Sequence, residues 1–165
     1  MPYLSLTTWS LHRHLGPLRW TRWVAESKTQ AVEIQHQPET VTLLELPSVL
    51  EEKGFSAVEV CHFHLPETSE DYFSKLRAAV QAAGIRLYSL LVDYGDISSS
   101  DPERRSADIA FMKQWIDYAS AAGAERVRII AGDADPADQE GFDRAAGALL
   151  ELIRIRFGPR GSDRD

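Results

Sequence analysis

Residues 85–131 read IRLYSLLVDYGDISSSDPERRSADIAFMKQWIDYASAAGAERVRIIA, and this stretch decides the fold class. It begins with 85–92, a nearly continuous apolar run that is typical of a strand buried on both faces. Asp101 and Pro102 then open a helix, because aspartate caps helices well and proline fits the first helical position. A second apolar segment follows at 126–131. A strand, a helix and another strand predict parallel strands joined by a right-handed crossover.

The rest of the chain repeats this alternation. We expect further strands at 4–9 and 57–61, and helices at about 43–53, 70–83 and from Asp135 onward, where an aspartate–proline pair again suggests an N-cap. An open doubly wound sheet and a closed barrel both fit an alternating α/β chain. No G-x-G-x-x-G segment follows a strand, which disfavours a dinucleotide-binding sheet.

A long connection, residues 12–39, separates the first strand from the first helix and is expected to be an irregular loop. Loops of this length in compact domains are usually functional or mobile. Trp20 and Trp23 lie in it, and Trp9 precedes it. These aromatic side chains could stack on the apolar faces of sugars at a barrel mouth, or pack on the core.

Composition limits the function classes. The 165 residues carry a net charge of -7 with a pI of about 5.2, which disfavours binding to nucleic acid. No apolar stretch approaches the ~20 residues of a membrane helix. The N-terminus has no basic segment before its apolar run, so no secretory signal is expected. The lone Cys61 permits no internal disulfide, which fits a cytoplasmic location.

Four segments carry a family resemblance: LSLTTWSL (4–11), SAVEVCHFHLP (56–66), IRLYSLLVDYGD (85–96) and ERVRIIAGDADP (125–136). Together and in this order they resemble the xylose isomerase-like TIM-barrel superfamily, which includes sugar-phosphate isomerases and epimerases and is related to endonuclease IV-type DNA repair enzymes. The resemblance covers nearly the whole chain up to residue 150.

The resemblance implies an α/β fold that is a partial (β/α)8 TIM barrel. About four parallel strands, each followed by a helix, would form the N-terminal half over residues 1–152. Residues 153–165 lose the apolar helical face and carry four arginines, so an irregular, flexible tail is expected there. Whole barrels of this kind have ~250 residues, so we expect the chain to be truncated before closure.

Candidate substrate-binding residues follow from the strand ends, where barrel enzymes place their active sites. Alternation along the strands predicts that Glu59 and Arg128 point into the barrel, because their apolar neighbours should face the helices. Arg128 could bind a phosphate or carboxylate, or form an internal ion pair, for instance with Glu59.

Other polar residues also follow the strands. His12, His62, Asp93 and Asp133 are candidates for contact with a sugar-like substrate. The two carboxylates could instead bind a cation, and His12 could serve only as a hydrogen-bonded loop residue. His62 and His64 form an H-x-H pair that could place two imidazoles near one metal ion, or serve as hydrogen-bonded loop histidines.

The resemblance implies an isomerase or epimerase that transfers a proton next to a carbonyl of a sugar-like substrate with the help of Mn²⁺, Mg²⁺ or Zn²⁺. It also implies that the main metal ligands lie on later strands, so activity should be impaired in this chain. A non-catalytic half-barrel that forms a homo-oligomer through its exposed strand edges is the alternative. A DNA repair nuclease is disfavoured by the acidic composition.

Overall fold

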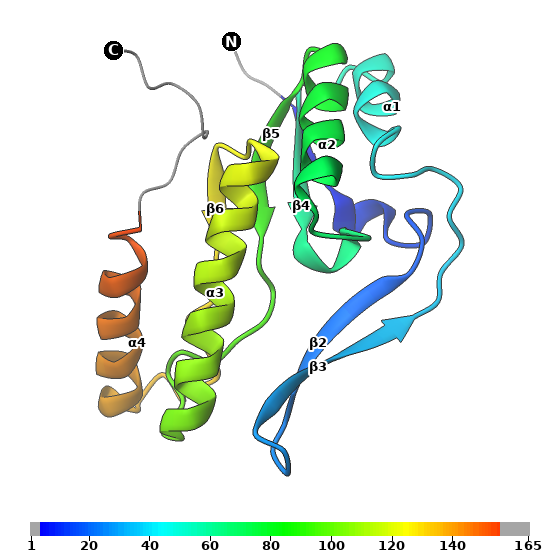
Figure 1. The fold of residues 1–165 in the computed structure, drawn as a ribbon. Coiled ribbons are helices and arrows are strands. Elements are labelled where there is room, and N and C mark those ends of the chain that lie inside the picture. Colours follow the sequence, from blue (N-terminus) through cyan, green and yellow to red (C-terminus); the bar gives the residue numbers. More distant parts are fainter. Residues whose placement is uncertain (1–3, 156–165) are drawn as a thin grey trace.

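Four strands form one parallel sheet in the order β1-β4-β5-β6, and the chain alternates between strands and helices (Figure 1). The computed structural model describes residues 4–155. The strands are β1 (Ser5–Thr7), β4 (Ala57–Cys61), β5 (Arg86–Leu91) and β6 (Arg126–Arg128). The helices are α1 (Leu46–Glu52), α2 (Glu70–Ala82), α3 (Pro102–Ala122) and α4 (Gln139–Leu152). Within the described residues the sheet does not close, so the predicted partial barrel is confirmed.

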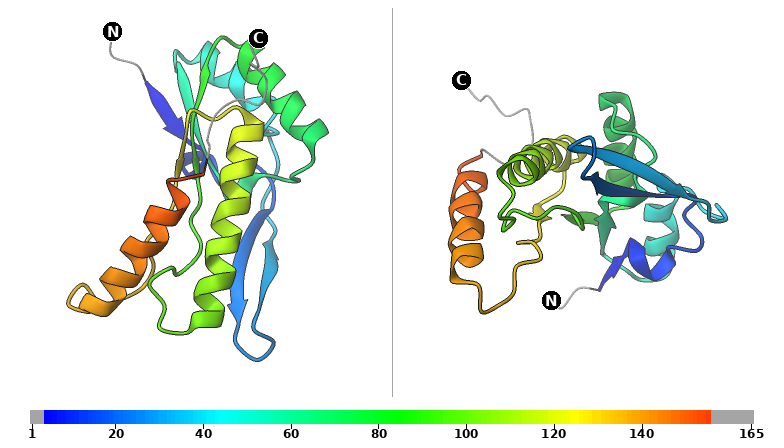
Figure 2. Two further views of the ribbon diagram at one scale, coloured as in Figure 1. Left: turned by 60° about the vertical axis from the view of Figure 1, so that its left-hand side comes forward. Right: turned by 90° about the horizontal axis from the view of Figure 1, so that it is seen from below.

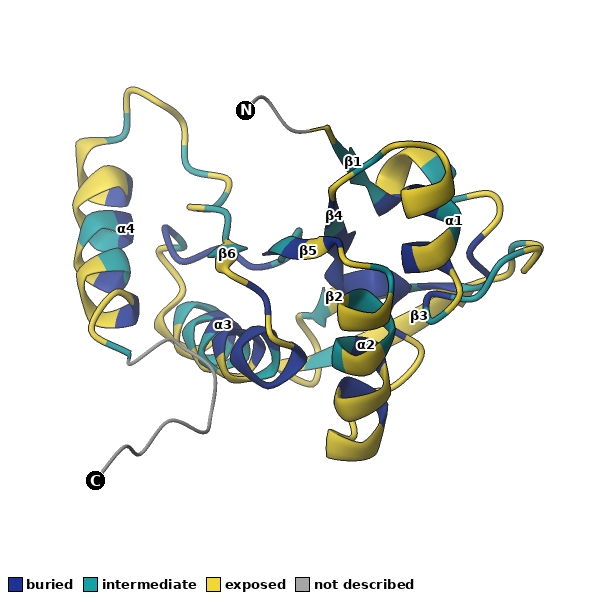
Figure 3. Cartoon of the chain, turned by 90° about the horizontal axis from the view of Figure 1, so that it is seen from above, coloured by how far each residue is buried: buried dark blue, intermediate teal, exposed yellow. Residues whose placement is uncertain are grey.

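The four helices lie around the outer side of the curved sheet and leave the inner side open (Figures 2 and 3). Their buried residues face the strands, whereas their solvent-facing sides are exposed (Figure 3). Since all four strands run in the same direction, their carboxyl ends meet at one rim of the sheet. The segments that can carry a site therefore converge there.

The core fills the space between the sheet and the helices. Val58, Leu90 and Phe73 are among its buried side chains, with at most 2 % of their surface exposed. Val127 and Ile129 pack against the core from the β6 segment, as the alternation of apolar and polar residues predicted. The sheet therefore turns its apolar side outward to the helices.

The predicted helix ends agree with the structure at α2 and α3. The Ser69 hydroxyl accepts a hydrogen bond from the Tyr72 backbone N–H at 3.2 Å, and an Asp101 carboxylate oxygen accepts one from the Glu103 N–H at 2.9 Å. Gly123 ends α3 with a φ of 77°, a left-handed conformation that glycine adopts without strain.

The long connection after β1 differs from the prediction of an irregular loop. Residues 18–35 form an antiparallel hairpin of β2 (Leu18–Val24) and β3 (Thr29–Gln35). Charged residues obscure its strand pattern in the sequence, because they pair across the hairpin: Arg22 Nε lies 2.7 Å from Glu33 Oε2. The hairpin extends from the rim where the strands end (Figure 1).

Other boundaries also differ, and β6 ends at Arg128 rather than at residue 131. β1 is shorter than predicted and leads into a 3₁₀ helix, η1 (Thr8–Leu11). Asp135 does not cap α4, because the helix starts after Asp138; its carboxylate instead accepts a hydrogen bond from the Ala137 N–H at 2.8 Å in the preceding turn. Of the predicted tail, residues 156–165 lie outside the described part of the chain.

None of the helices within residues 4–155 combines the length and apolar character needed to cross a membrane.

The packing predicts where the chain is sensitive to cavities. Leu90→Ala removes a side chain with 0 % exposure at the centre of the sheet and should lower the free energy of unfolding by about 2–5 kcal/mol. Leu150→Ala, at a position 55 % exposed on α4, should cost less than about 1 kcal/mol. Urea denaturation followed by circular dichroism measures both, and equal losses would contradict the described core.

Candidate functional site

A hollow of about 380 Å³ lies at the carboxyl rim of the sheet. All four strands or the residues directly after them contribute to its lining, and the hairpin adds one wall. The lining residues are Thr7, Trp9, Trp20, Cys61, Phe63, Leu91, Asp93 and Arg128. The hollow therefore occupies the position at which a barrel of this type places a site.

Three aromatic rings form one side of the hollow. The ring centroids of Trp20 and Phe63 are 4.4 Å apart, and Trp9 meets Phe63 edge to face at 5.8 Å. Leu18 and Cys61 are buried in the same hydrophobic cluster as Phe63, and Trp20 packs against this cluster. Aromatic faces held in place by neighbours suit the apolar faces of a ligand.

An ion pair forms the polar side. Arg128 Nη2 donates to Asp93 Oδ1, and the two side chains are 50 % and 28 % exposed, respectively. Arg128 is therefore on the inner side of the sheet, paired with Asp93 rather than with Glu59. The accessible edges of this pair offer both hydrogen-bond donors and acceptors to a ligand.

His62 lies behind the hollow in the 3₁₀ helix η2 (His62–His64). Its Nδ1 accepts a hydrogen bond from the Asp93 backbone N–H at 3.2 Å, and its ring packs edge to face on Trp115 at 5.1 Å. Its Nε2 is buried with no hydrogen-bond partner among the described residues. Burial lowers the pKa of His62 to about 4, so the ring is neutral at pH 7.

His64 joins two strand ends. Its Nδ1 lies 2.9 Å from the Thr8 hydroxyl, which in turn accepts a hydrogen bond from the Cys61 N–H at 2.9 Å. Burial lowers the pKa of His64, too, to about 4. This buried connection fixes η1, which carries Trp9, against η2, which carries Phe63.

The two histidines do not form a metal centre with other side chains. Within residues 4–155, no three or more His, Cys, Asp or Glu side chains are grouped so that they could hold a metal ion. The residues described here therefore do not by themselves fit the divalent metal that the resemblance implied.

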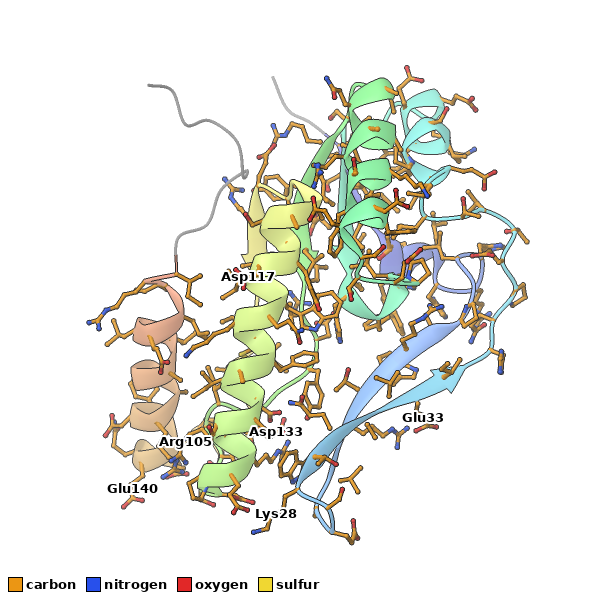
Figure 4. The ribbon with its side chains drawn as sticks, in the orientation of Figure 1. Lys28, Glu33, Arg105, Asp117, Asp133 and Glu140 are labelled. Carbon is orange, nitrogen blue, oxygen red and sulfur yellow. The ribbon has the colours of Figure 1, made fainter. Side chains whose placement is uncertain are left out.

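The other predicted site residues are spread along the rim. His12 stacks on Trp9 at 4.5 Å and donates from Nδ1 to the Trp9 carbonyl oxygen at 2.9 Å, next to the hollow. Glu59 does not line the hollow, and its Oε1 accepts a hydrogen bond from the Ser5 hydroxyl at 2.9 Å. Asp133 lies beside α3, 3.6 Å from an Arg104 nitrogen (Figure 4).

Sequence reasoning missed Phe63, Cys61, Thr7 and Leu91 as lining residues. Period-two alternation from Glu59 would have indicated Cys61, since alternate residues of a strand share a face. Phe63 follows the strand end, where that alternation no longer applies.

The buried histidines predict acid sensitivity of the metal-free protein. Each has a folded-state pKa near 4 against about 6.5 when unfolded, so protons bind to the unfolded chain first as the pH falls. Stability should therefore be fully present above pH 6.5 and decrease toward pH 4, by up to about 1.4 kcal/mol per histidine and pH unit. His64→Gln should flatten this slope in urea titrations from pH 7 to 4.5, and an unchanged slope would contradict the assignment.

Comparison with known proteins agrees with this geometry. Residues 47–161 match the family model described as "Xylose isomerase-like TIM barrel". No curated protein sequence matches the chain.

Several solved structures are similar in fold. An L-ribulose 3-epimerase has a TM-score of 0.64 at 14% identity, with 92% of this chain and 45% of that one covered. A D-psicose 3-epimerase from Clostridium cellulolyticum H10, solved with D-tagatose, has a TM-score of 0.62 at 15% identity, with coverages of 92% and 47%. A 3-keto-D-glucoside 4-epimerase from E. coli has a TM-score of 0.52 at 16% identity, with coverages of 67% and 45%.

The chain thus spans less than half the length of these structures, and at such identities the likeness concerns the fold alone. The family model, in contrast, matches most of the chain and includes β4, β5, β6 and the helices that follow them. The chain belongs to the xylose isomerase-like TIM-barrel family.

Proposed function

We propose that the rim hollow binds a sugar-like substrate and is the substrate-binding part of an isomerase- or epimerase-like active site. The observation that carries this proposal is the pairing of an aromatic wall, Trp9, Trp20 and Phe63, with the Asp93–Arg128 ion pair across one hollow. Sugars have the same two-sided character, with C–H faces and hydroxyl edges.

Each side of the hollow has a defined task in this proposal. Trp9 and Trp20, which pack on the buried Phe63 ring, stack on the C–H face of the sugar and exclude water from it. Asp93 accepts hydrogen bonds from hydroxyl groups, and Arg128 donates to hydroxyl or carbonyl oxygens. The volume of about 380 Å³ lies at the lower end of the range of roughly 300–1,000 Å³ for small-molecule sites, which suits a monosaccharide.

The reaction itself is proposed for the whole barrel. Isomerisation or epimerisation next to a carbonyl needs a base that removes a proton and a group that stabilises the enediolate oxygen. In the described residues, Asp93 is held by Arg128, and no metal-binding group is assembled. This chain therefore binds and orients the sugar, while the base and any divalent-metal ligands come from further strands, and turnover by this chain alone is impaired.

Binding of D-tagatose tests the proposal. Titration by calorimetry should show saturable binding, and Arg128→Met should weaken it about 10- to 100-fold, because a charge-assisted hydrogen bond is lost. Trp20→Ala should weaken it about tenfold through lost stacking.

Matched controls lie close by. Arg126→Met changes an arginine of the same strand that stacks on Tyr88, 4.4 Å from the ring centroid. Trp23→Ala changes a tryptophan of the same hairpin strand; neither residue lines the hollow. Both variants should bind like the original chain. Absence of saturable binding, or equal losses in the control and test variants, would refute the proposed site.

Self-association is a second candidate role, and the open sheet favours it. Within residues 4–155, β1 and β6 each pair on one side only, and exposed strand edges tend to recruit further strands. Three large apolar side chains on and directly after α4 are also exposed: Phe142, Leu150 and Ile153.

Sedimentation velocity tests this candidate. Edge pairing predicts a dimer whose fraction rises with protein concentration between about 1 and 100 µM, a range typical of moderate affinities. A monomer throughout this range would rule out edge pairing as a role of this chain.

A further inference from the structure

Asp108, on α3, has 0 % of its surface exposed although it carries a carboxylate. Its Oδ2 accepts a hydrogen bond from the Asp96 backbone N–H at 2.8 Å, and Arg104 Nε lies 3.6 Å away. Its Oδ1 accepts one from Gln30 Nε2 at 2.8 Å. A buried carboxylate is costly unless it is paired and hydrogen-bonded, so this full set of partners is a built feature rather than an incidental surface contact.

Gln30 belongs to the hairpin. Its Nε2 also lies 3.3 Å from the Ala107 carbonyl oxygen, so one amide group joins β3 to both the backbone and a buried side chain of α3. At the hairpin tip, Lys28 forms an exposed ion pair with Glu103 near the start of α3 (Figure 4). The far end of the hairpin is therefore attached to α3.

The near end of the same hairpin is a wall of the hollow. Leu18 is 1 % exposed beneath the aromatic group, and Trp20 lines the hollow. In the β2–β3 register, Gln30 is opposite Trp23, which is three residues from Trp20 and on the other face of the hairpin. Because the two strands are paired along their whole length, a displacement of the hairpin at Gln30 would move Trp20 as well.

We propose that Asp108 is a positioning residue: through Gln30 it holds the hairpin so that Trp20 closes the hollow. The same carboxylate fixes Asp96 in the β5–α3 connection, which follows Asp93 by three residues. Asp108 thus determines the relative placement of the aromatic wall and the polar side without touching a ligand. For sugar binding, this inference rests on the proposed function; for the hairpin, it stands independently.

Hydrogen–deuterium exchange of the whole chain tests the attachment without any ligand. Gln30→Ala and Asp108→Asn should each speed amide exchange in residues 18–35 by about tenfold or more, because a buried hydrogen bond to a charged group is lost. Exchange in β4 and α2 should remain unchanged. Lys28→Ala removes the exposed pair between the same two elements and should change hairpin exchange by only about twofold.

Swapping the donor and the acceptor side chains between positions 30 and 108 distinguishes a positioning role from a general loss of structure. The double variant Gln30→Glu/Asp108→Asn keeps one donor and one acceptor at the contact in reversed order. It should restore slow hairpin exchange and, where D-tagatose binds, the affinity lost in each single variant.

The outcomes distinguish the two proposals. Amide exchange of the hairpin that is unchanged in both single variants, or exchange accelerated equally throughout the chain, would overturn the positioning role. If the original chain does not bind D-tagatose, the proposed function is refuted. The hydrogen–deuterium exchange results then still test whether Asp108 holds the hairpin through Gln30. If a variant with faster hairpin exchange still binds D-tagatose as tightly as the original chain, the claim that this attachment positions Trp20 for binding is overturned.

Discussion

Parallel strand pairing is the constraint on which the rest of the structure depends. Parallel neighbours need a crossover between them, and here each crossover contains a helix that covers the apolar side of the sheet. The strands therefore end at one rim, and the residues after them meet there although they are far apart in the sequence. Thr7, Cys61, Leu91 and Arg128 come together for this reason.

Buried polar contacts then give this rim a defined shape. The Thr8–His64 contact joins the ends of β1 and β4, and the His62–Asp93 contact joins the ends of β4 and β5. Both involve neutral histidine rings, which tolerate burial better than charged ones. Several aromatic and ionic groups of the hollow take part in these contacts or are adjacent to them in the sequence. The residues that connect the strand ends therefore also orient side chains that line the hollow.

Much of this architecture could be predicted from the sequence. A nearly continuous apolar run identifies β5, the alternation around Glu59 fits β4, and the Ser69 and Asp101 caps locate the starts of α2 and α3, because these signals are local. Arg128 was predicted on the inner side from alternation alone. Its ion-pair partner could not be predicted, since the choice between Glu59 and Asp93 depends on where each strand ends relative to its neighbours in the sheet.

The hairpin was harder to predict for a related reason. β3 is mostly exposed and β2 is mostly half-buried, so no continuous apolar face marks them. Their contacts are to each other and, through Gln30, to the distant Asp108. The failure of Asp135 as a cap is similar: the local pattern was correct for a turn, but packing places the start of α4 after Asp138.

The central claim is that the rim hollow is the place where a sugar binds, and nitrogen-15 NMR of the tryptophan indoles tests it most directly. The four tryptophans are Trp9, Trp20, Trp23 and Trp115, of which only the first two line the hollow. On addition of D-tagatose, the indole signals of Trp9 and Trp20 should shift in a saturable manner while that of Trp23 remains in place. Shifts confined to Trp23 or Trp115, or no shift at all, would contradict the account.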